Sequence, residues 1–513
     1  MIPTTRASLS LGAALAALVV LALPLALSSC SKEPASSGGG ASAAKKGDAI
    51  FLAEAPAVVP DELEPELDVM GIGRLYVAGA TLSSSGSVTA LQPPPPNRIK
   101  KPVVFVVMAE AGAEDALNPG AKGELVGEGW GAGLGKSLAE ARSWATVTGV
   151  HLHLRVGPTH IPALASALKS LKRLVGGLPI SVTLPTDLTP EAMKPLSGAV
   201  DEVLLFSLGR RPETGDRLVT EPTREAAQAM TIPFRVLIVP GGYGRAGADG
   251  LGRRIPDGEI DKLSEDRNLD FDFGEVLSNE AGNVYVFKPR KGSEPSATLL
   301  GPDGGSAVFR TMGFGEIVRF VSSASRWGAP KFLGRVFLVD GLPRDGHVVG
   351  YPAIRAVLTG KPVAPHLEIS VEPRASGKGS VEFVIKASNT TPVPTDLSHL
   401  YNSIDIRTEG GVFTAVKAGD FDRFDLLSSE DEKAQRVPFG RATVCRLFEN
   451  FYAAEETNLT GPIRIVGKDV KVFVKYQLAV SGGEPIRGNE VQVMVNAPEP
   501  TPRPKPATRP KKR

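Results

Sequence analysis

Short apolar runs recur from Leu75 to about Pro343, with helical patterns between several of them. The runs are rich in Val, Leu and Ile and alternate little with polar residues, which is typical of strands buried on both faces. They cover residues 75–80, 103–109, 150–156, 180–184, 203–208, 234–239 and 336–339. Residues 136–148 and 161–175 place apolar side chains three and four positions apart, so both are predicted helices.

This alternation of strand and helix predicts an α/β fold with a parallel sheet, and its length suits a TIM-barrel-like domain over residues 48–362. A doubly wound open sheet is the alternative. Against it, no glycine-rich phosphate-binding loop follows the first of these strands.

The pattern changes after Pro365. Between residues 366 and 497 the chain shows only short β-type runs bounded by turns, several of them strictly alternating, which predicts an all-β immunoglobulin-like sandwich. The runs are 367–371, 380–387, 403–407, 470–478 and 490–495. The tail at 498–513 is mostly Pro, Lys and Arg with almost nothing apolar, so it is predicted to be disordered.

The N-terminus has the pattern of a targeting segment. Arg6 precedes an apolar stretch at 9–27, which ends in Leu27-Ser28-Ser29-Cys30. This end resembles the lipobox of bacterial lipoproteins, where cleavage precedes a lipid-bearing cysteine, so residues 1–29 are a predicted signal peptide and Cys30 a predicted lipidation site. An ordinary secretory signal and a transmembrane helix are the alternatives.

Residues 30–47 follow as a Ser/Gly-rich flexible linker. Ser31 after the cysteine favours, by resemblance to a known sorting rule, anchoring in the outer membrane, with the body facing the periplasm or the cell surface. The membrane is therefore the one partner that the N-terminus itself predicts.

Charge and cysteine content bear on the possible partners, disulfides and metal sites of the protein. Lys and Arg number 58 against 56 Asp and Glu, so no global charge indicates a nucleic-acid partner. Only 2 cysteines occur, and with Cys30 lipidated, Cys445 would be left without a disulfide partner. It lies in a strand-like run and is expected to be a buried, inert thiol. No metal or cofactor motif is complete: His151 and His153, two apart, lack a third zinc ligand.

Several short segments of the barrel region, in the same order, resemble the bacterial family called domain of unknown function 3142. The resemblance covers about residues 75 to 362 and implies an exported protein, often a lipoprotein, with a barrel like that of TIM-barrel glycoside hydrolases. The matching segments are Trp144-Ala145, Gly149-Val150, 179–183, 200–203, 233–236, Gly242-Tyr243-Gly244 and 358–362.

One strand departs from this family, whose members carry acidic residues there at alternate positions. Here the alternate positions hold His151, His153 and Arg155, which share one face of the strand. In a barrel the apolar face packs on the helices, so these three side chains are predicted to point inward. They are either a ligand-binding set, with Arg155 favouring anionic or neutral polar ligands, or core groups satisfied by their neighbours.

Candidate catalytic groups are few. Sites in TIM barrels gather after the carboxyl ends of the strands, where the chain offers Glu110, Asp187 and Asp340 as weak candidates. Tyr243 and Arg245 follow another predicted strand and join the predicted ligand-binding set. The Asp201-Glu202 pair begins its strand and is predicted to be structural.

Two functions remain open. The first is a non-catalytic envelope protein with a degenerate glycosidase-like barrel that binds a glycan or an anionic envelope component. The second is a glycoside hydrolase-like enzyme that uses a pair of those carboxylates, which would need to lie roughly 5 to 10 Å apart.

Overall fold

The structure is a computed structural model of the chain. It describes residues 46–53, 63–91, 98–110, 113, 128–154, 156–186, 188–211, 215–218, 220–240, 243–246, 253–254, 266, 268–272, 283–290, 307–311, 313–339, 351–360, 363–377, 379–395, 398, 401–430, 434–480 and 484–493. The predicted signal peptide, Cys30 and the basic tail lie outside these residues. None of the described helices has the length and apolar character to cross a membrane.

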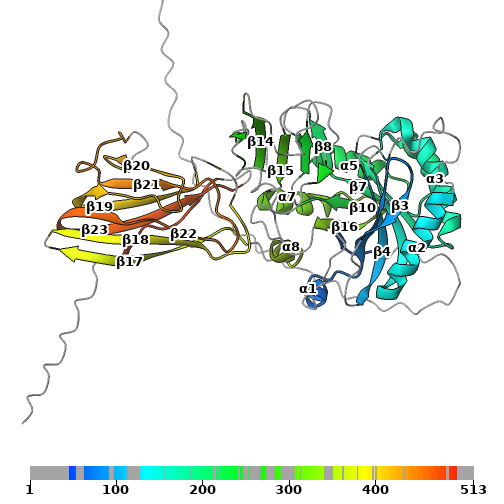
Figure 1. The fold of residues 1–513 in the computed structure, drawn as a ribbon, viewed down its shortest axis with the longest axis horizontal. Helices are drawn as coiled ribbons and strands as arrows, with labels where there is room; N and C mark the ends of the chain where they lie inside the picture. Colours follow the sequence, from blue (N-terminus) through cyan, green and yellow to red (C-terminus); the bar gives the residue numbers. More distant parts are fainter. Residues whose placement is uncertain are drawn as a thin grey trace, which may run out of the picture. The chain divides into compact units, whose positions relative to one another are not determined.

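Eight parallel strands close into a barrel (Figure 1). The order is β1-β16-β10-β7-β6-β5-β4-β2, and β1 also pairs with β2, which closes the circle. Their bounds are β1 Ala49–Leu52, β2 Leu75–Leu82, β4 Ile99–Ala109, β5 Ala145–His153, β6 Ile180–Pro185, β7 Glu202–Phe206, β10 Phe234–Ile238 and β16 Phe332–Val339. The predicted TIM-barrel-like fold is confirmed, and the open doubly wound sheet is wrong.

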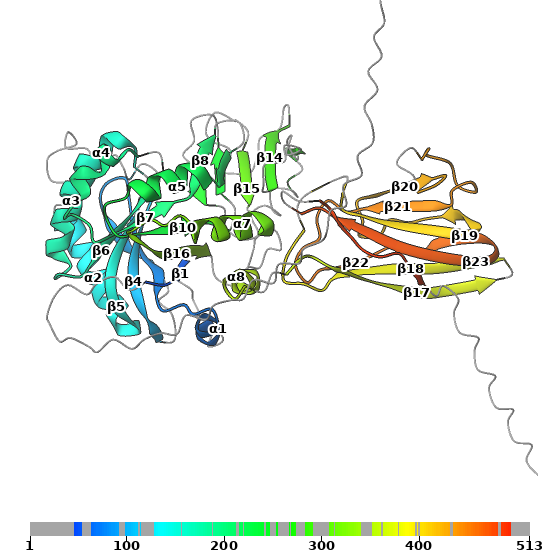
Figure 2. The ribbon, with the colours of Figure 1, turned by 180° about the vertical axis from the view of Figure 1, so that it is seen from behind.

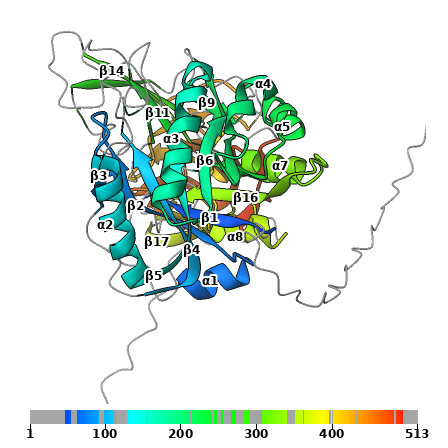
Figure 3. The ribbon, with the colours of Figure 1, turned by 90° about the vertical axis from the view of Figure 1, so that its right-hand side faces the viewer.

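The helices lie around the outside of these strands (Figures 2 and 3). The apolar stripe of α3 explains why: Leu164, Leu168 and Leu171 recur at spacings of four and three and are all buried. The helices are α1 Leu63–Val69, α2 Glu128–Trp144, α3 Ile161–Leu174, α4 Pro190–Met193, α5 Thr220–Ala229, α7 Phe314–Ala324 and α8 Tyr351–Leu358, with 3₁₀ turns η2 Pro158–His160 and η3 Lys194–Leu196.

The expected elements differ from the observed ones most clearly at β5 and at β1. The predicted helix over 136–148 ends at Trp144, and the four residues after it begin β5. In addition, β1 was not predicted, although its four residues are all buried and supply the eighth barrel strand. The pairing of β1 with β16 on one side and β2 on the other makes it the element that closes the barrel.

A small antiparallel sheet follows β10, in the order β12-β11-β15-β14-β13. Its strands are β11 Tyr243–Ala246, β12 Arg253–Arg254, β13 Leu269–Asp272, β14 Asn283–Pro289 and β15 Ala307–Thr311. A two-stranded ribbon of β8 Leu208–Arg211 and β9 Gly215–Leu218 precedes it, and β3 Val88–Ala90 pairs antiparallel with β2. The sequence analysis did not predict the five-stranded antiparallel sheet.

The C-terminal strands form an antiparallel β domain, which confirms the predicted fold class of this region. The long β23 pairs with β18 through its first four residues and with β19 along most of its length. The strands are β17 Leu367–Gly377, β18 Ser380–Asn389, β19 Ser403–Ala415, β20 Arg423–Leu427, β21 Val444–Phe448, β22 Thr457–Leu459, β23 Ile463–Leu478, β24 Ile486–Arg487 and β25 Val491–Val493.

Alternate side chains of these strands build a hydrophobic core that includes Phe383, Ile406, Val472 and Val474. Cys445 lies in this core, and burial raises the pKa of its thiol far above the ordinary value, so the thiolate needed for reactivity is suppressed. The domain boundary near 361–365 stays a prediction.

Candidate functional site

His151 projects from β5 into the interior of the barrel. Its ring contacts Phe51 of β1 and Tyr76 of β2, with ring centroids 5.8 and 5.5 Å away. Neither of those strands is a neighbour of β5 in the sheet, so the contacts cross the barrel interior. His151 is fully buried, while His153, the last residue of β5, is half-buried and packs edge-on against Phe51 at 5.2 Å.

A chain of four polar groups joins β5 to β6. His151 Nδ1 lies 2.9 Å from Ser181 Oγ, and its Nε2 lies 2.9 Å from Thr183 Oγ1. The same Thr183 hydroxyl lies 2.9 Å from His153 Nδ1. Because one hydroxyl has one proton, Thr183 can donate to at most one of the two histidines, so the two ring nitrogens that face it cannot both be acceptors and the two tautomers are coupled.

Burial keeps His151 uncharged. Desolvation, and then the neighbouring His153, hold the pKa of His151 well below its usual value. A neutral imidazole has one donor and one acceptor nitrogen, which matches a hydroxyl partner on each side. At neutral pH His151 therefore adds hydrogen-bonding capacity to the interior but no charge.

An ion network around Glu202, the first residue of β7, lies next to His151, and Tyr76 contacts both residues. Tyr76 and Arg235 both donate to Glu202 Oε1, the Arg235 Nε at 3.0 Å, and Arg74 Nη1 lies 3.4 Å from Oε2. Arg235 also donates to the carbonyl of Gly47. Glu202 and Arg235 are buried, with exposed fractions of 5% and 2%.

These side chains come from the amino-terminal ends of β1, β2, β7 and β10, the end that TIM barrels use for stability. A glycine makes the close approach possible: a Cβ at Gly334, whose φ is +146°, would meet the Gly47 carbonyl oxygen at 2.2 Å. The network closes the base of the barrel, in agreement with the structural role predicted for Glu202. Asp201 likewise accepts from Lys172 and from the backbone N–H of Ile180, at 2.8 Å each.

The predicted site residues are distributed unevenly over the structure. The inward orientation of His151 and His153 agrees with the prediction from strand alternation. Arg155, Asp187 and Asp340 lie outside the described residues. Glu110 follows β4 at its carboxyl end and is exposed.

Tyr243 and Arg245 lie in β11, which pairs with β12 and β15 of the small antiparallel sheet. They are thus separated from the barrel strand β10 that precedes them. A role for either residue in ligand binding stays a prediction.

Sequence reasoning did not single out Ser181, Thr183, Tyr76 or Arg235. Ser and Thr in a Val-rich strand are ordinary strand residues, and only the pairing of His151 with Ser181 in the β5–β6 ladder brings them together. One signal was available, because the alternation of Ser181 and Thr183 matches that of His151 and His153 on the preceding strand.

The arrangement supports hydrogen bonding more than acid–base catalysis. Most glycoside hydrolases use two carboxyl groups that flank the scissile bond. Among the described residues, the carboxylate inside the barrel is Glu202, at the base and held by three donors. Nor, among these residues, do three His, Cys, Asp or Glu side chains converge to hold a metal ion.

Comparisons with known proteins give structural resemblances only. No family model matches the chain, so the resemblance to the domain of unknown function 3142 stays a prediction, and no curated protein matches. Among solved structures, the chain is similar to a chitinase from Chromobacterium violaceum ATCC 12472, with 14% identity and a TM-score of 0.37 over 62% of this chain and 98% of that one.

A second similar structure is the spore cortex-lytic enzyme SleL of Bacillus megaterium QM B1551, with 13% identity and a TM-score of 0.36 over 62% of this chain and 74% of that one. A third is active domain 2 of a thermostable chitinase from Pyrococcus furiosus, with 10% identity and a TM-score of 0.31, covering 61% and 93% of the two chains. At these identities, function has to be argued from the site itself.

Proposed function

We propose that this chain is an exported protein, held by lipid on Cys30 at a bacterial membrane, whose barrel binds a glycan or an anionic envelope component without hydrolysing it. The observation that carries the proposal is the chain of hydrogen bonds from Ser181 through His151 and Thr183 to His153. It occupies the interior between β5 and β6 and rises toward the carboxyl ends of the strands, where TIM barrels bind their ligands.

His153 is the member of this hydrogen-bonded chain of side chains that a ligand would contact first. It ends β5 and is half-buried, whereas His151 below it is fully buried. A ligand hydroxyl or carboxylate that hydrogen bonds to His153 is coupled through Thr183 to His151, because the single Thr183 proton can serve only one of the two histidines. A coupled chain of this kind orients a polar ligand through hydrogen bonds.

Positive charge at the mouth would come from Arg155, two residues beyond His153 in the sequence. A guanidinium presents a planar fork suited to carboxylate or phosphate groups. It also works against a hydrolytic acid, since nearby positive charge lowers a carboxyl pKa that this role requires to be raised. The ligand class is therefore neutral polar or anionic.

Binding to a glycan array by the purified protein, followed by titration calorimetry with the strongest hit, tests the proposal. We expect His153→Ala to weaken binding at least about tenfold, the effect of losing roughly 1.4 kcal/mol of hydrogen bonding. Arg155→Ala is expected to weaken the binding of acidic glycans more than the binding of neutral ones.

The matched control is His366→Ala. His366 hydrogen bonds to Tyr476 in the β domain, with the two atoms 2.7 Å apart, so its loss should leave binding unchanged. Release of reducing sugar from any array hit by the wild-type protein would contradict binding without catalysis. It would favour the hydrolase, and Glu110 would then be the first carboxylate to substitute.

The anchor has a separate test. Cys30→Ala removes the thiol that would carry the lipid, so the protein is expected to leave the membrane fraction or to remain as the uncleaved precursor. Membrane fractionation and gel mobility of the expressed protein measure this. Unchanged behaviour of the variant in both assays would show that the lipobox resemblance is coincidental.

A further inference from the structure

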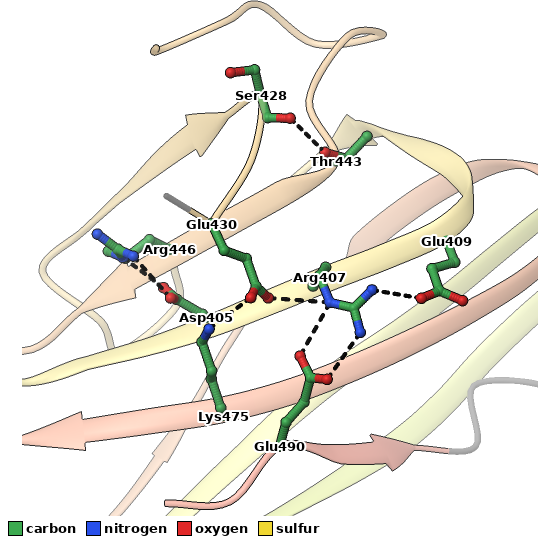
Figure 4. A network of polar contacts seen from close by, with 9 residues as sticks. All are labelled: Asp405, Arg407, Glu409, Ser428, Glu430, Thr443, Arg446, Lys475 and Glu490. Carbon is green, nitrogen blue, oxygen red and sulfur yellow. Dashed lines mark hydrogen bonds and ion pairs between the residues drawn. The ribbon is translucent and has the colours of Figure 1, made fainter. Parts of the chain in front are cut away.

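Charged side chains on the face of the β domain around β19 are paired with one another (Figure 4). Arg407 contacts three carboxylates at 2.7 to 3.2 Å, those of Glu409, Glu430 and Glu490. Lys475 Nζ lies 2.7 Å from Glu430. Because these charges neutralise one another within the chain, this face offers little net charge to a ligand.

The β2–β3 hairpin of the barrel domain has a polar face of a different kind. Its ladder pairs Thr81 with Thr89 and Leu82 with Val88. Leu82 and Val88 are buried, and a Cβ at Gly133 of α2 would lie 2.3 Å from the Val88 carbonyl oxygen, so α2 packs closely on this apolar side. Since successive side chains of a strand alternate between its two faces, Thr81 and Thr89 point to the other side.

The face that carries these threonine hydroxyls is turned toward the barrel interior. The parallel ladders align Thr81 of β2 with Met108 of β4, and Met108 with His153 of β5. Residues aligned in this way have their side chains on the same face of the sheet. His153 contacts Phe51 across the interior, so Met108 and Thr81 also point inward, at the carboxyl ends of their strands.

The turn of the hairpin extends this row of hydroxyl groups. The N–H of Ser83 donates to the carbonyl of Ser87, so the strand pairing continues there and both side chains lie on the threonine face. Ser83 Oγ lies 2.7 Å from Ser87 Oγ and 2.8 Å from Ser85 Oγ. Ser85, Ser87 and Thr89 are exposed. The hairpin thus presents uncharged hydroxyl groups at the mouth of the barrel.

The inward side chains at the carboxyl end differ in exposure between the two sides of the barrel. On one side, Phe206 of β7 contacts His153, and Leu338 of β16 is aligned with Phe51; they are 0% and 1% exposed. On the hairpin side, Met108 and His153 are only half-buried. A ligand therefore reaches the inward side chains over β2, β4 and β5, beside the hairpin.

We propose that the hairpin side of the mouth binds a neutral sugar unit. The hydroxyls of Thr81, Thr89 and Ser87 would hydrogen bond to its hydroxyl groups, and Met108 would pack against its C–H face. This inference rests on the proposed function of the barrel and narrows its ligand to a glycan with an uncharged unit at this position.

The chemistry of these side chains favours a sugar over an anion. A Ser or Thr hydroxyl both donates and accepts hydrogen bonds, as each sugar hydroxyl does, so the two can pair in either direction. An anionic group binds best to charged donors or to several N–H groups. Glu110, which is exposed and whose N–H donates to the Leu82 carbonyl, instead places negative charge beside the hairpin.

The test probes the full-length protein on an array of uncharged and acidic glycans. The uncharged probes are oligomers of glucose, mannose, galactose and N-acetylglucosamine, and the acidic probes are oligomers of galacturonic acid. We expect at least one uncharged oligomer to bind, and the acidic oligomers to bind at least about tenfold more weakly in titration calorimetry.

Thr81→Val and Thr89→Val each remove a hydroxyl and keep the branched shape of the side chain. Each is expected to weaken binding of the strongest uncharged oligomer about three- to tenfold, the effect of one lost hydrogen bond. The matched control is Thr457→Val, which removes an exposed hydroxyl 2.8 Å from Ser388 in the β domain and should bind as wild type does. Thr89 is exposed, so its variant keeps the test valid even if Thr81→Val fails to fold.

His153→Ala separates this inference from the proposed function on which it rests. If His153→Ala weakens binding whereas Thr81→Val and Thr89→Val bind as wild type does, the barrel binds a glycan but the hairpin inference is overturned. Binding of acidic oligomers alone has the same meaning. If wild type binds no glycan of either class, glycan binding by the barrel is itself wrong, and the hairpin inference is overturned with it.

Discussion

Arg235→Ala is expected to lower the free energy of unfolding of the barrel by about 3 to 5 kcal/mol. Arg235 donates to Glu202 at 3.0 Å from a position that is 2% exposed. Removing it leaves the Glu202 carboxylate buried with Tyr76 and the longer contact to Arg74, and it also frees the Gly47 carbonyl. An uncompensated buried charge costs more than the lost contact itself.

Urea unfolding followed by tryptophan fluorescence measures this effect. All 3 tryptophans, at positions 130, 144 and 327, belong to the barrel region, so the fluorescence reports on the barrel and not on the β domain. The control is Arg355→Ala, which breaks a pair with Glu66 in which both side chains are more than 40% exposed, and should cost about 1 kcal/mol or less. Adding Glu202→Gln to Arg235→Ala removes the stranded charge and should restore part of the stability. A loss below about 1 kcal/mol in Arg235→Ala would mean that water reaches the base of the barrel.

The sequence predicted seven of the eight barrel strands because most of their residues are buried, so that each strand contains a continuous apolar run. It missed β1, whose four residues are too few to establish a period after a linker. It extended a helix past Trp144 because the residues that begin β5 continue the apolar spacing of α2. The sheet that follows β10 has short strands, and so weak patterns, and local periodicity did not reveal it.

Alternation of residues along one strand predicted which side chains of the candidate site share a face, but not which residues of other strands they contact. The period of two placed His151 and His153 on one face, but their partners depend on strand register across β5 and β6. The partners of Glu202 come from β2 and β10, more than 30 residues away on either side, and only closure of the barrel brings them together.

Below about pH 6.5 the barrel is expected to lose stability because of His151, by about 1.4 kcal/mol per pH unit and so by roughly 2 kcal/mol at pH 5. Burial and His153 hold the pKa of folded His151 well below its ordinary value, whereas in the unfolded chain it titrates at about 6.5. Below that pH the unfolded state binds the extra proton, so the unfolded state gains stability as pH falls. Above about pH 6.5 both states are neutral at this position, and the contribution is constant.

The difference between wild type and His151→Gln isolates this residue from the other groups that titrate in the same range. Glutamine is neutral at every pH and offers one donor and one acceptor to Ser181 and Thr183, as a neutral imidazole does. Urea unfolding measured from pH 5 to 8 should therefore show a shallower pH dependence for His151→Gln, by about one proton, whatever its stability at pH 8. His366→Gln in the β domain should leave the wild-type slope of the barrel unchanged. If His151→Gln and wild type have parallel curves, His151 accepts a proton inside the folded barrel, and the neutral hydrogen-bonded chain to His153 is the wrong description of the interior.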